Sequence, residues 1–116
     1  MDQEIINNVL LDFKKNVDSK GIKNYRIILF GSALNGTYSN ESDIDIAIIS
    51  DDFKNKSITE RAVMISDIEF QLTKKYLVPL DIMKLTVDEY ENETRMIASY
   101  VKEGKVLYAA DEKFQI

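Results

Sequence analysis

Apolar residues recur at helical spacing in three parts of the chain. Between residues 2 and 20 they lie three or four positions apart, which is typical of one buried helix face, and Gly21 follows where the helix would end. Two capping boxes, at residues 57–60 (SITE) and 86–89 (TVDE), predict the starts of two further helices, which end near Tyr76 and Val101. The residues of the middle helix expected to face the core are Ile58, Ala62, Ile65, Ile68 and Leu72.

Runs rich in β-branched and aromatic residues predict strands between these helices. They are residues 25–30 (YRIILF), 43–49 (DIDIAII) and 80–85 (LDIMKL), and residues 106–108 (VLY) are a candidate for a short final strand. This order of elements predicts an α+β fold in which helices pack on a small mixed β-sheet. No repeat, low-complexity tract or linker divides the sequence, so residues 1–116 are interpreted as one domain.

Composition restricts the chemistry that this chain can perform. The sequence contains neither cysteine nor histidine, which excludes disulfides, thiol catalysis, Cys/His zinc sites and histidine acid–base chemistry. The remaining catalytic groups are carboxylates, hydroxyls, amines and backbone amides, together with a bound metal ion.

The net charge of the chain argues against general binding of nucleic acids. The 20 acidic and 15 basic residues give a formal charge of −5, whereas general nucleic-acid binding depends on an excess of cations. A single nucleotide held through Mg²⁺ is still compatible with this balance.

Two features bear on location. No stretch approaches the length of a transmembrane helix, and the first residues, MDQE, are acidic rather than the basic start of a signal peptide. We therefore expect a cytoplasmic protein without a membrane partner.

Aspartates at the start of the second predicted strand form a candidate site. Asp43 and Asp45 lie two residues apart, so their side chains share one face of the strand, about 7 Å apart along the chain. Carboxylates this close repel unless a cation lies between them, and these hard oxygen ligands favour Mg²⁺ or Mn²⁺. Asp81 begins the third predicted strand, and all three carboxylates can converge if the second and third strands are neighbours.

A glycine-containing turn precedes this pair. Gly31 follows the first predicted strand directly, and Ser32 would open a short helix or turn. Glycine lets a phosphate approach the backbone, while a serine hydroxyl and free amides can bind an anion. Ten residues separate Ser32 from Asp43, so one loop would bring a phosphate-binding turn and a metal-binding pair together.

Other acidic residues have a simpler interpretation. Asp51 and Asp52 are interpreted as a solvated loop, and Glu89, Glu91 and Glu93 as surface charges that stabilise the start of a helix.

The combined motif, Gly31-Ser32 followed after ten residues by Asp43-Ile44-Asp45, resembles the signature of DNA polymerase beta-like nucleotidyltransferases. The small size, the downstream Asp81 and the segment 103–108 (EGKVLY) look like the minimal nucleotidyltransferase (MNT) branch. The resemblance extends over about residues 25–108.

The resemblance implies a mechanism. A nucleoside triphosphate such as ATP would place its β- and γ-phosphates on Gly31 and Ser32, while Asp43 and Asp45 hold Mg²⁺ or Mn²⁺. Asp81 would help to hold the catalytic metal ion and would orient or deprotonate the attacking hydroxyl group. The products are a nucleotidylated acceptor and pyrophosphate.

One departure concerns the residues after Ser32. Many minimal members carry arginines there, whereas this chain has Ala33, Leu34 and Asn35, so cationic contacts to the triphosphate are missing. Lys23, Arg26 and Lys84 are available cations, although each is also readily explained as a surface charge.

The acceptor and the partner are inferred from the same resemblance. Only 35 residues follow Asp81 in this sequence, so we expect a second chain to complete the acceptor site, either another copy or a different protein. Minimal nucleotidyltransferases are commonly paired with small helical HEPN proteins as antitoxin and toxin, and some transfer AMP to a tyrosine of the toxin. The leading hypothesis is a protein adenylyltransferase that acts as such an antitoxin.

Two alternatives stay open. One is a transferase that modifies a small molecule, as antibiotic-modifying nucleotidyltransferases do. The other is a non-catalytic module that neutralises a partner by binding it, with its acidic surface against a basic one.

Overall fold

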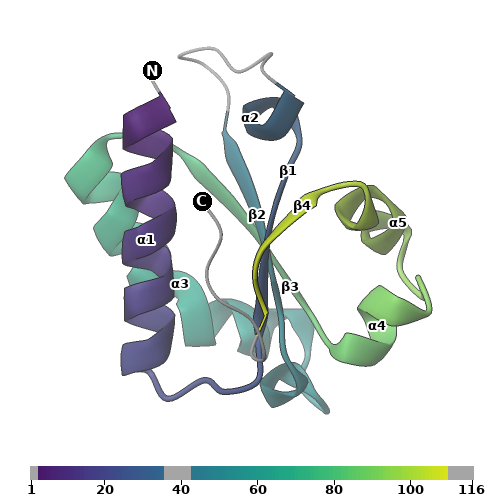
Figure 1. The fold of residues 1–116 in the computed structure, drawn as a ribbon. Helices are drawn as coiled ribbons and strands as arrows, with labels where there is room; N and C mark the ends of the chain where they lie inside the picture. The colour runs from purple at the N-terminus through teal and green to yellow at the C-terminus, as the bar shows by residue number, and fades with distance from the viewer. Residues whose placement is uncertain (1–2, 36–42, 110–116) are drawn as a thin grey trace.

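The computed structural model describes residues 3–35 and 43–109 (Figure 1). Helices and strands follow one another in nearly the predicted order. Their bounds are α1 Gln3–Ser19, β1 Arg26–Phe30, α2 Ser32–Asn35, β2 Ile44–Ile49, the 3-10 helix η1 Asp51–Phe53, α3 Ile58–Tyr76, β3 Leu80–Leu85, α4 Val87–Glu91, α5 Met96–Lys102 and β4 Lys105–Ala109. The α+β class and all four strands are therefore confirmed.

The four strands form one mixed sheet in the order β3-β2-β1-β4. Strand β1 is antiparallel to both β2 and β4, whereas β2 and β3 are parallel, with α3 as the crossover between them. As a result β1 ends where β2 and β3 begin. We call this edge, which adjoins α2, the α2 end of the sheet, and the opposite edge, where β3 leads into α4, the α4 end (Figure 1).

Helices cover both faces of the sheet, and each face has its own apolar core. On one face α1 and α3 pack over a core that includes Ile27, Leu29 and alternate residues of β2. On the other face α4 and α5 cover a smaller core. Its buried members are Ile28, Phe30, Ala47, Ile49, Leu85, Tyr90, Ala98 and Val101. This two-sided burial explains why β1 and β2 are apolar at almost every position.

Both predicted capping boxes are present. The Ser57 hydroxyl accepts a hydrogen bond from the Glu60 amide, and Thr86 and Glu89 form the equivalent pair at the start of α4. Ile65, Ile68 and Leu72 of α3 are buried as expected. The assignment of Ile58 to the core was wrong: its side chain is 64% exposed, because the first turn of α3 extends past the edge of the core.

The predicted helix from residue 87 to about Val101 is two helices. Helix α4 ends at Glu91, and Glu93 adopts a left-handed backbone conformation with φ of 50° before α5 begins. Asn92, Glu93 and Thr94 interrupt the apolar spacing, and this break lets α5 turn back to bury Ala98 and Val101 against β1. Tertiary packing therefore decided a boundary that the capping signal alone did not contain.

Gly104 permits the last strand to dock. A Cβ atom at this position would lie 2.6 Å from the Leu29 carbonyl oxygen and 2.7 Å from Ile28 Cγ2. No other residue fits without displacing β1, so this glycine does more than end a helix.

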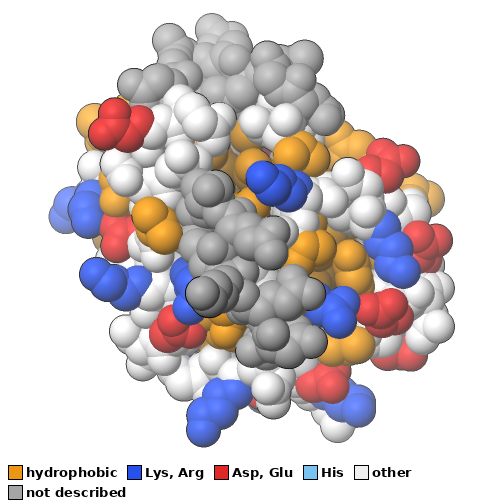
Figure 2. All heavy atoms as spheres, viewed as in Figure 1, with side chains coloured by type: hydrophobic (Ala, Val, Ile, Leu, Met, Phe, Trp, Pro, Cys, Tyr) orange, Lys and Arg blue, Asp and Glu red, His pale blue; other side chains and the backbone are white. Residues whose placement is uncertain are grey.

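The surface on the α4 and α5 side mixes apolar with charged side chains (Figure 2). Met96, Tyr100 and Val106 are the exposed large apolar residues of α5 and β4. Within the described ranges, no helix has the length and apolar character needed to cross a membrane.

Candidate active site

The parallel pairing of β2 with β3 brings two of the predicted aspartates side by side. Asp45 and Asp81 are register partners on neighbouring strands, and Asp43 lies immediately before β2. Because side chains alternate along a strand, Asp45 shares a face with Ala47, and Asp81 shares it with Met83. The carboxylates therefore lie at the α2 end of the sheet, on the face that α4 and α5 cover further along.

This proximity affects the electrostatics of Asp45. Burial raises the pKa of the Asp45 carboxyl group, and the negative charges of Asp81 and Asp43 raise it further. Within residues 3–35 and 43–109, no cation pairs with any of these three carboxylates. As far as the described residues show, the three carboxylates form an uncompensated cluster of negative charge.

Gly31 is in direct contact with this cluster. A Cβ atom at Gly31 would lie 2.1 Å from the Asp45 Oδ2 atom, and the Gly31 φ of 74° is unfavourable for other residues. The close approach arises because Phe30, the preceding residue, is the register partner of Asp45. Ser32 then begins the four-residue helix α2, as predicted. The structure thus brings the Gly-Ser turn next to Asp45.

The donor set suits a hard divalent cation, because it consists of carboxylate oxygens that repel one another. In the part of the chain that the structure describes, no three acidic side chains are arranged as a ready-made metal site. The residues therefore fit Mg²⁺ or Mn²⁺ by chemistry, and binding an ion would require the carboxylates to turn towards one another. A triphosphate would add further oxygen ligands.

Ala33 and Leu34, which replace the arginines of many minimal members, have a structural role. Ala33 is buried, and Leu34 packs against the core beneath α1. A cavity of about 250 Å³ separates α2 from α1 and β4. It is lined by Gln3, Asn7, Leu10, Leu29, Ala33, Leu34, Lys105 and Leu107. These two positions anchor α2 and offer no charge to a phosphate.

The three cations that were available in place of the missing arginines all lie at or near the α4 end, away from the Gly-Ser turn. Arg26 starts β1 at the α4 end and pairs with Glu91 at 2.9 Å, and Lys84 is near the end of β3. Lys23 precedes β1, so it also lies beyond the α4 end. Lys105, which sequence reasoning missed, is the register partner of Leu29 and lines the cavity beneath α2, on the α1 face of the sheet and not on the face that carries the carboxylates.

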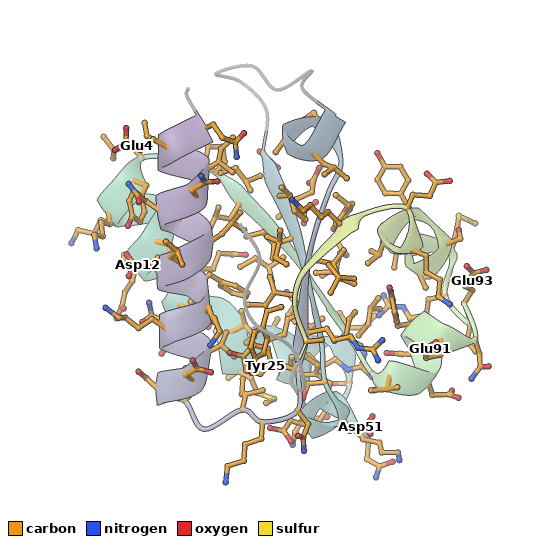
Figure 3. All side chains as sticks on the ribbon, in the orientation of Figure 1. Glu4, Asp12, Tyr25, Asp51, Glu91 and Glu93 are labelled. Carbon is orange, nitrogen blue, oxygen red and sulfur yellow. The ribbon has the colours of Figure 1, made fainter. Side chains whose placement is uncertain are left out.

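The acidic residues set aside as surface charges do lie away from the cluster. Asp51 follows β2 at the α4 end, and Glu91 and Glu93 lie in and after α4 (Figure 3). Glu89 needs a correction, because it is largely buried and structural. Its carboxylate accepts hydrogen bonds from Arg61 Nη1 at 2.7 Å and from the Thr86 amide at 2.8 Å.

Sequence reasoning also missed the aromatic border of the site. The Tyr100 ring of α5 packs edge-on against Phe30, with 5.5 Å between ring centroids, and Phe30 lies opposite Asp45. Tyr100 is 50% exposed. The sequence could have indicated Phe30, since this residue immediately precedes the glycine turn. It could not have indicated Tyr100, because the position of α5 depends on the break between α4 and α5.

This fold and site define a class: a small mixed sheet whose α2 end presents a Gly-Ser turn beside strand-borne carboxylates. The family model described as polymerase beta, nucleotidyltransferase, matches residues 12–113, and the chain therefore belongs to this family. It carries a nucleotidyltransferase domain.

A solved structure has the same fold. It is a protein from Sulfolobus solfataricus described as a candidate nucleotidyltransferase, and it is 18% identical with a TM-score of 0.61. The similarity covers 100% of this chain and 96% of that chain. No curated protein matches the sequence significantly.

Proposed function

We propose that this protein transfers a nucleoside monophosphate, AMP from ATP, to a hydroxyl group of an acceptor. The observation that carries the proposal is the register of β2 and β3, which places Asp45 beside Asp81 while Gly31 contacts the Asp45 carboxylate. A phosphate-binding turn and the carboxylates of a metal-dependent transferase then lie within one small region, as family membership leads us to expect.

Each residue has a role in this proposal. Asp43, Asp45 and Asp81 hold Mg²⁺, which when bound neutralises the triphosphate and the charge that develops at the α-phosphorus. Gly31 and Ser32 position the β- and γ-phosphates through the turn backbone and the serine hydroxyl. Asp81 accepts the proton of the acceptor hydroxyl group. The hydroxyl oxygen forms a bond to the α-phosphorus as the bond to the bridging oxygen breaks, and pyrophosphate leaves.

Affinity for the triphosphate should be modest. The positions after Ser32 are occupied by packing residues rather than cations, and each missing charge-assisted hydrogen bond is worth roughly 1.5–3 kcal/mol. Tyr100 borders the cluster on the β1 side and offers an aromatic surface on which the nucleobase could stack.

For the acceptor, we propose a tyrosine hydroxyl group of a small helical HEPN protein, with this chain as its antitoxin. The support is the resemblance of the glycine turn, the three aspartates and the segment 103–108 to minimal nucleotidyltransferases. Modification of the toxin would neutralise it.

Label transfer from α-labelled ATP tests both the proposed transferase activity and the proposed HEPN acceptor. In the presence of Mg²⁺, the wild-type chain should label a purified HEPN partner, and Asp45→Asn should reduce the rate by about a thousandfold or more. Asp51→Asn is the matched control, because Asp51 is an exposed aspartate at the α4 end, and it should retain the wild-type rate.

The outcomes separate the alternatives. Label on a small hydroxyl compound instead of the protein would favour the small-molecule transferase. If neither is labelled while the partner is still neutralised, the chain is a binding module and the enzymatic proposal is wrong.

A further inference from the structure

The cavity beneath α2 is a second concave feature of the molecule, and the proposed function does not use it. It has a volume of about 250 Å³ and lies between α1, α2 and β4, at the α2 end of the sheet. Protein interiors are close-packed, with few voids larger than a water molecule, so a cavity of this size needs an explanation. An engineered apolar cavity of about 150 Å³ holds a benzene molecule. The cavity beneath α2 is therefore large enough for a small ring or a short chain that carries one polar group.

Apolar side chains form the floor of the cavity. Leu10 of α1, Leu29 of β1 and Leu107 of β4 line it, and each is at most 5% exposed. Ala33 and Leu34 line the side that α2 forms. An apolar group placed among these residues is removed from water, which favours its binding.

Polar groups lie on the outer part of the lining. Gln3 and Lys105 are exposed, and Asn7 is partly buried. Gln3 Nε2 donates a hydrogen bond to Asn7 Oδ1 at 2.8 Å, which leaves the Asn7 Nδ2 group without a partner among the described residues. Within residues 3–35 and 43–109, no carboxylate pairs with the Lys105 ammonium group. The outer part of the cavity thus offers an amide donor and a cation.

This combination of groups favours one ligand chemistry. None of the described lining residues is acidic, so Lys105 favours an anion and disfavours a cation. A carboxylate accepts hydrogen bonds from both an ammonium group and an amide, and charge-assisted hydrogen bonds are about twice as strong as neutral ones. Beside an apolar floor, these donors suit a molecule with an apolar body and one carboxylate.

We propose that the cavity beneath α2 binds a small hydrophobic carboxylic acid. Its apolar body lies against the leucines of the floor, and its carboxylate lies at Lys105 and Asn7. The floor belongs to the core on the α1 face of the sheet, whereas the carboxylate cluster lies on the opposite face. The bound acid is therefore neither the nucleotide nor the acceptor, and the proposal does not depend on the proposed function.

NMR titration of the full chain with phenylacetate tests the proposal, with leucine methyl signals as the readout. The methyl signals of Leu10, Leu34 and Leu107 should shift together, with a Kd of about 1 mM, as expected for a ligand of about ten non-hydrogen atoms. The signals of Leu85, at the α4 end and in the other core, should not move. The neutral analogue 2-phenylethanol should bind about tenfold more weakly, because it lacks the carboxylate.

Lys105→Met separates the effect of charge from that of shape. Methionine keeps an unbranched side chain and removes the cation, so the Kd for phenylacetate should rise about tenfold while the Kd for 2-phenylethanol stays unchanged. The matched control is Lys23→Met, because Lys23 is an exposed lysine before β1 at the opposite end of the sheet, and it should change neither Kd. Circular dichroism should show wild-type folding for both variants.

Three results would overturn the proposal. The first is that the signals of the cavity leucines do not shift at phenylacetate concentrations about tenfold above the expected Kd. The second is that phenylacetate and 2-phenylethanol bind the wild type equally well, which would mean that the carboxylate is not recognised. The third is that Lys105→Met binds phenylacetate as tightly as the wild type does.

Discussion

The acidic residues at the two ends of the sheet differ in whether a cation lies beside them. At the α2 end, Asp43, Asp45 and Asp81 lie near one another without a cation among the described residues, and the pKa of Asp45 is raised. At the α4 end, the carboxylate of Glu89 pairs with Arg61, which is itself buried and also donates to the Lys84 carbonyl at 3.1 Å.

The pKa of Glu89 shows the consequence of pairing. Burial alone would raise the pKa of this carboxyl group, but hydrogen bonds from Arg61 and Thr86 outweigh burial and hold it below its usual range. Compensated acids at the α4 end stabilise the junction of α3, β3 and α4. Uncompensated acids at the α2 end cost stability, and such clusters are typical of sites that bind an ion or a substrate.

The largest expected effect on stability is at the α4 end. Arg61→Ala should lower the free energy of unfolding by about 3 kcal/mol or more, because it leaves Glu89 without its cation in a largely buried position. Urea denaturation measures the change. Arg26→Ala is the matched control: it removes an exposed ion pair with Glu91 and should cost less than about 1 kcal/mol. If the two variants lose the same free energy of unfolding, the buried Arg61–Glu89 pair contributes no more to stability than the exposed Arg26–Glu91 pair.

A ligand should have the next largest effect, at the α2 end. Mg²⁺ together with ATP should raise the melting temperature, because a ligand that binds only the folded state at a hundred times its Kd adds about 2.7 kcal/mol. EDTA should cancel the rise, which thermal denaturation will detect. The same addition to Asp45→Asn should give little or no rise, and a full rise there would argue against the carboxylate cluster as the binding site.

A smaller effect on stability is expected from relieving the repulsion among the three carboxylates at the α2 end. Without metal, Asp45→Asn should increase the free energy of unfolding at pH 7 by about 1 kcal/mol, or about 4 °C in melting temperature. Asp51→Asn should change stability little, because Asp51 is exposed and asparagine keeps the side-chain oxygen that accepts the Val87 amide at 3.4 Å. A loss of stability in Asp45→Asn would mean that this carboxylate is structural.

The pH dependence of these effects follows from the pKa directions. Because folding raises the pKa of Asp45, the wild type is penalised as pH rises through that pKa, and the advantage of Asp45→Asn should vanish below pH 3.8. Folding lowers the pKa of Glu89, so its contribution is present above pH 4.5 and is lost as pH falls through the lowered value. At neutral pH, thermal denaturation should therefore show that Asp45→Asn is more stable than the wild type and that Glu89→Gln is less stable. Both differences should disappear in acid, as the two carboxyl groups of the wild type become protonated.

Local signals in the sequence predicted most of the secondary structure. The capping boxes place the starts of α3 and α4, because the hydrogen bonds of a capping box form within four residues. The apolar runs predict all four strands. Local signals failed at Glu93, where a left-handed residue divides the last helix, and at Ile58, whose exposure depends on where the core ends.

The candidate site was predicted in part. The spacing from Gly31-Ser32 to Asp43 identified the turn and the pair, since they are close in the sequence. Whether Asp81 joins them depended on the condition that β2 and β3 are neighbours, and their parallel pairing meets that condition. The Arg61–Glu89 pair joins residues 28 positions apart, and no local pattern indicated it.

The sequence by itself determined most of the element types, the exclusion of thiol and histidine chemistry and the pairing of Asp43 with Asp45 after the Gly-Ser turn, because these depend on residue identity and near neighbours. The parallel pairing of β2 with β3 brought Asp81 to that pair. Only the tertiary structure decided which acids are compensated. Strand order, the turn of α5 back onto β1 and the reach of Arg61 set the distances between charges, and the energy of a charge depends on what lies within a few ångströms of it.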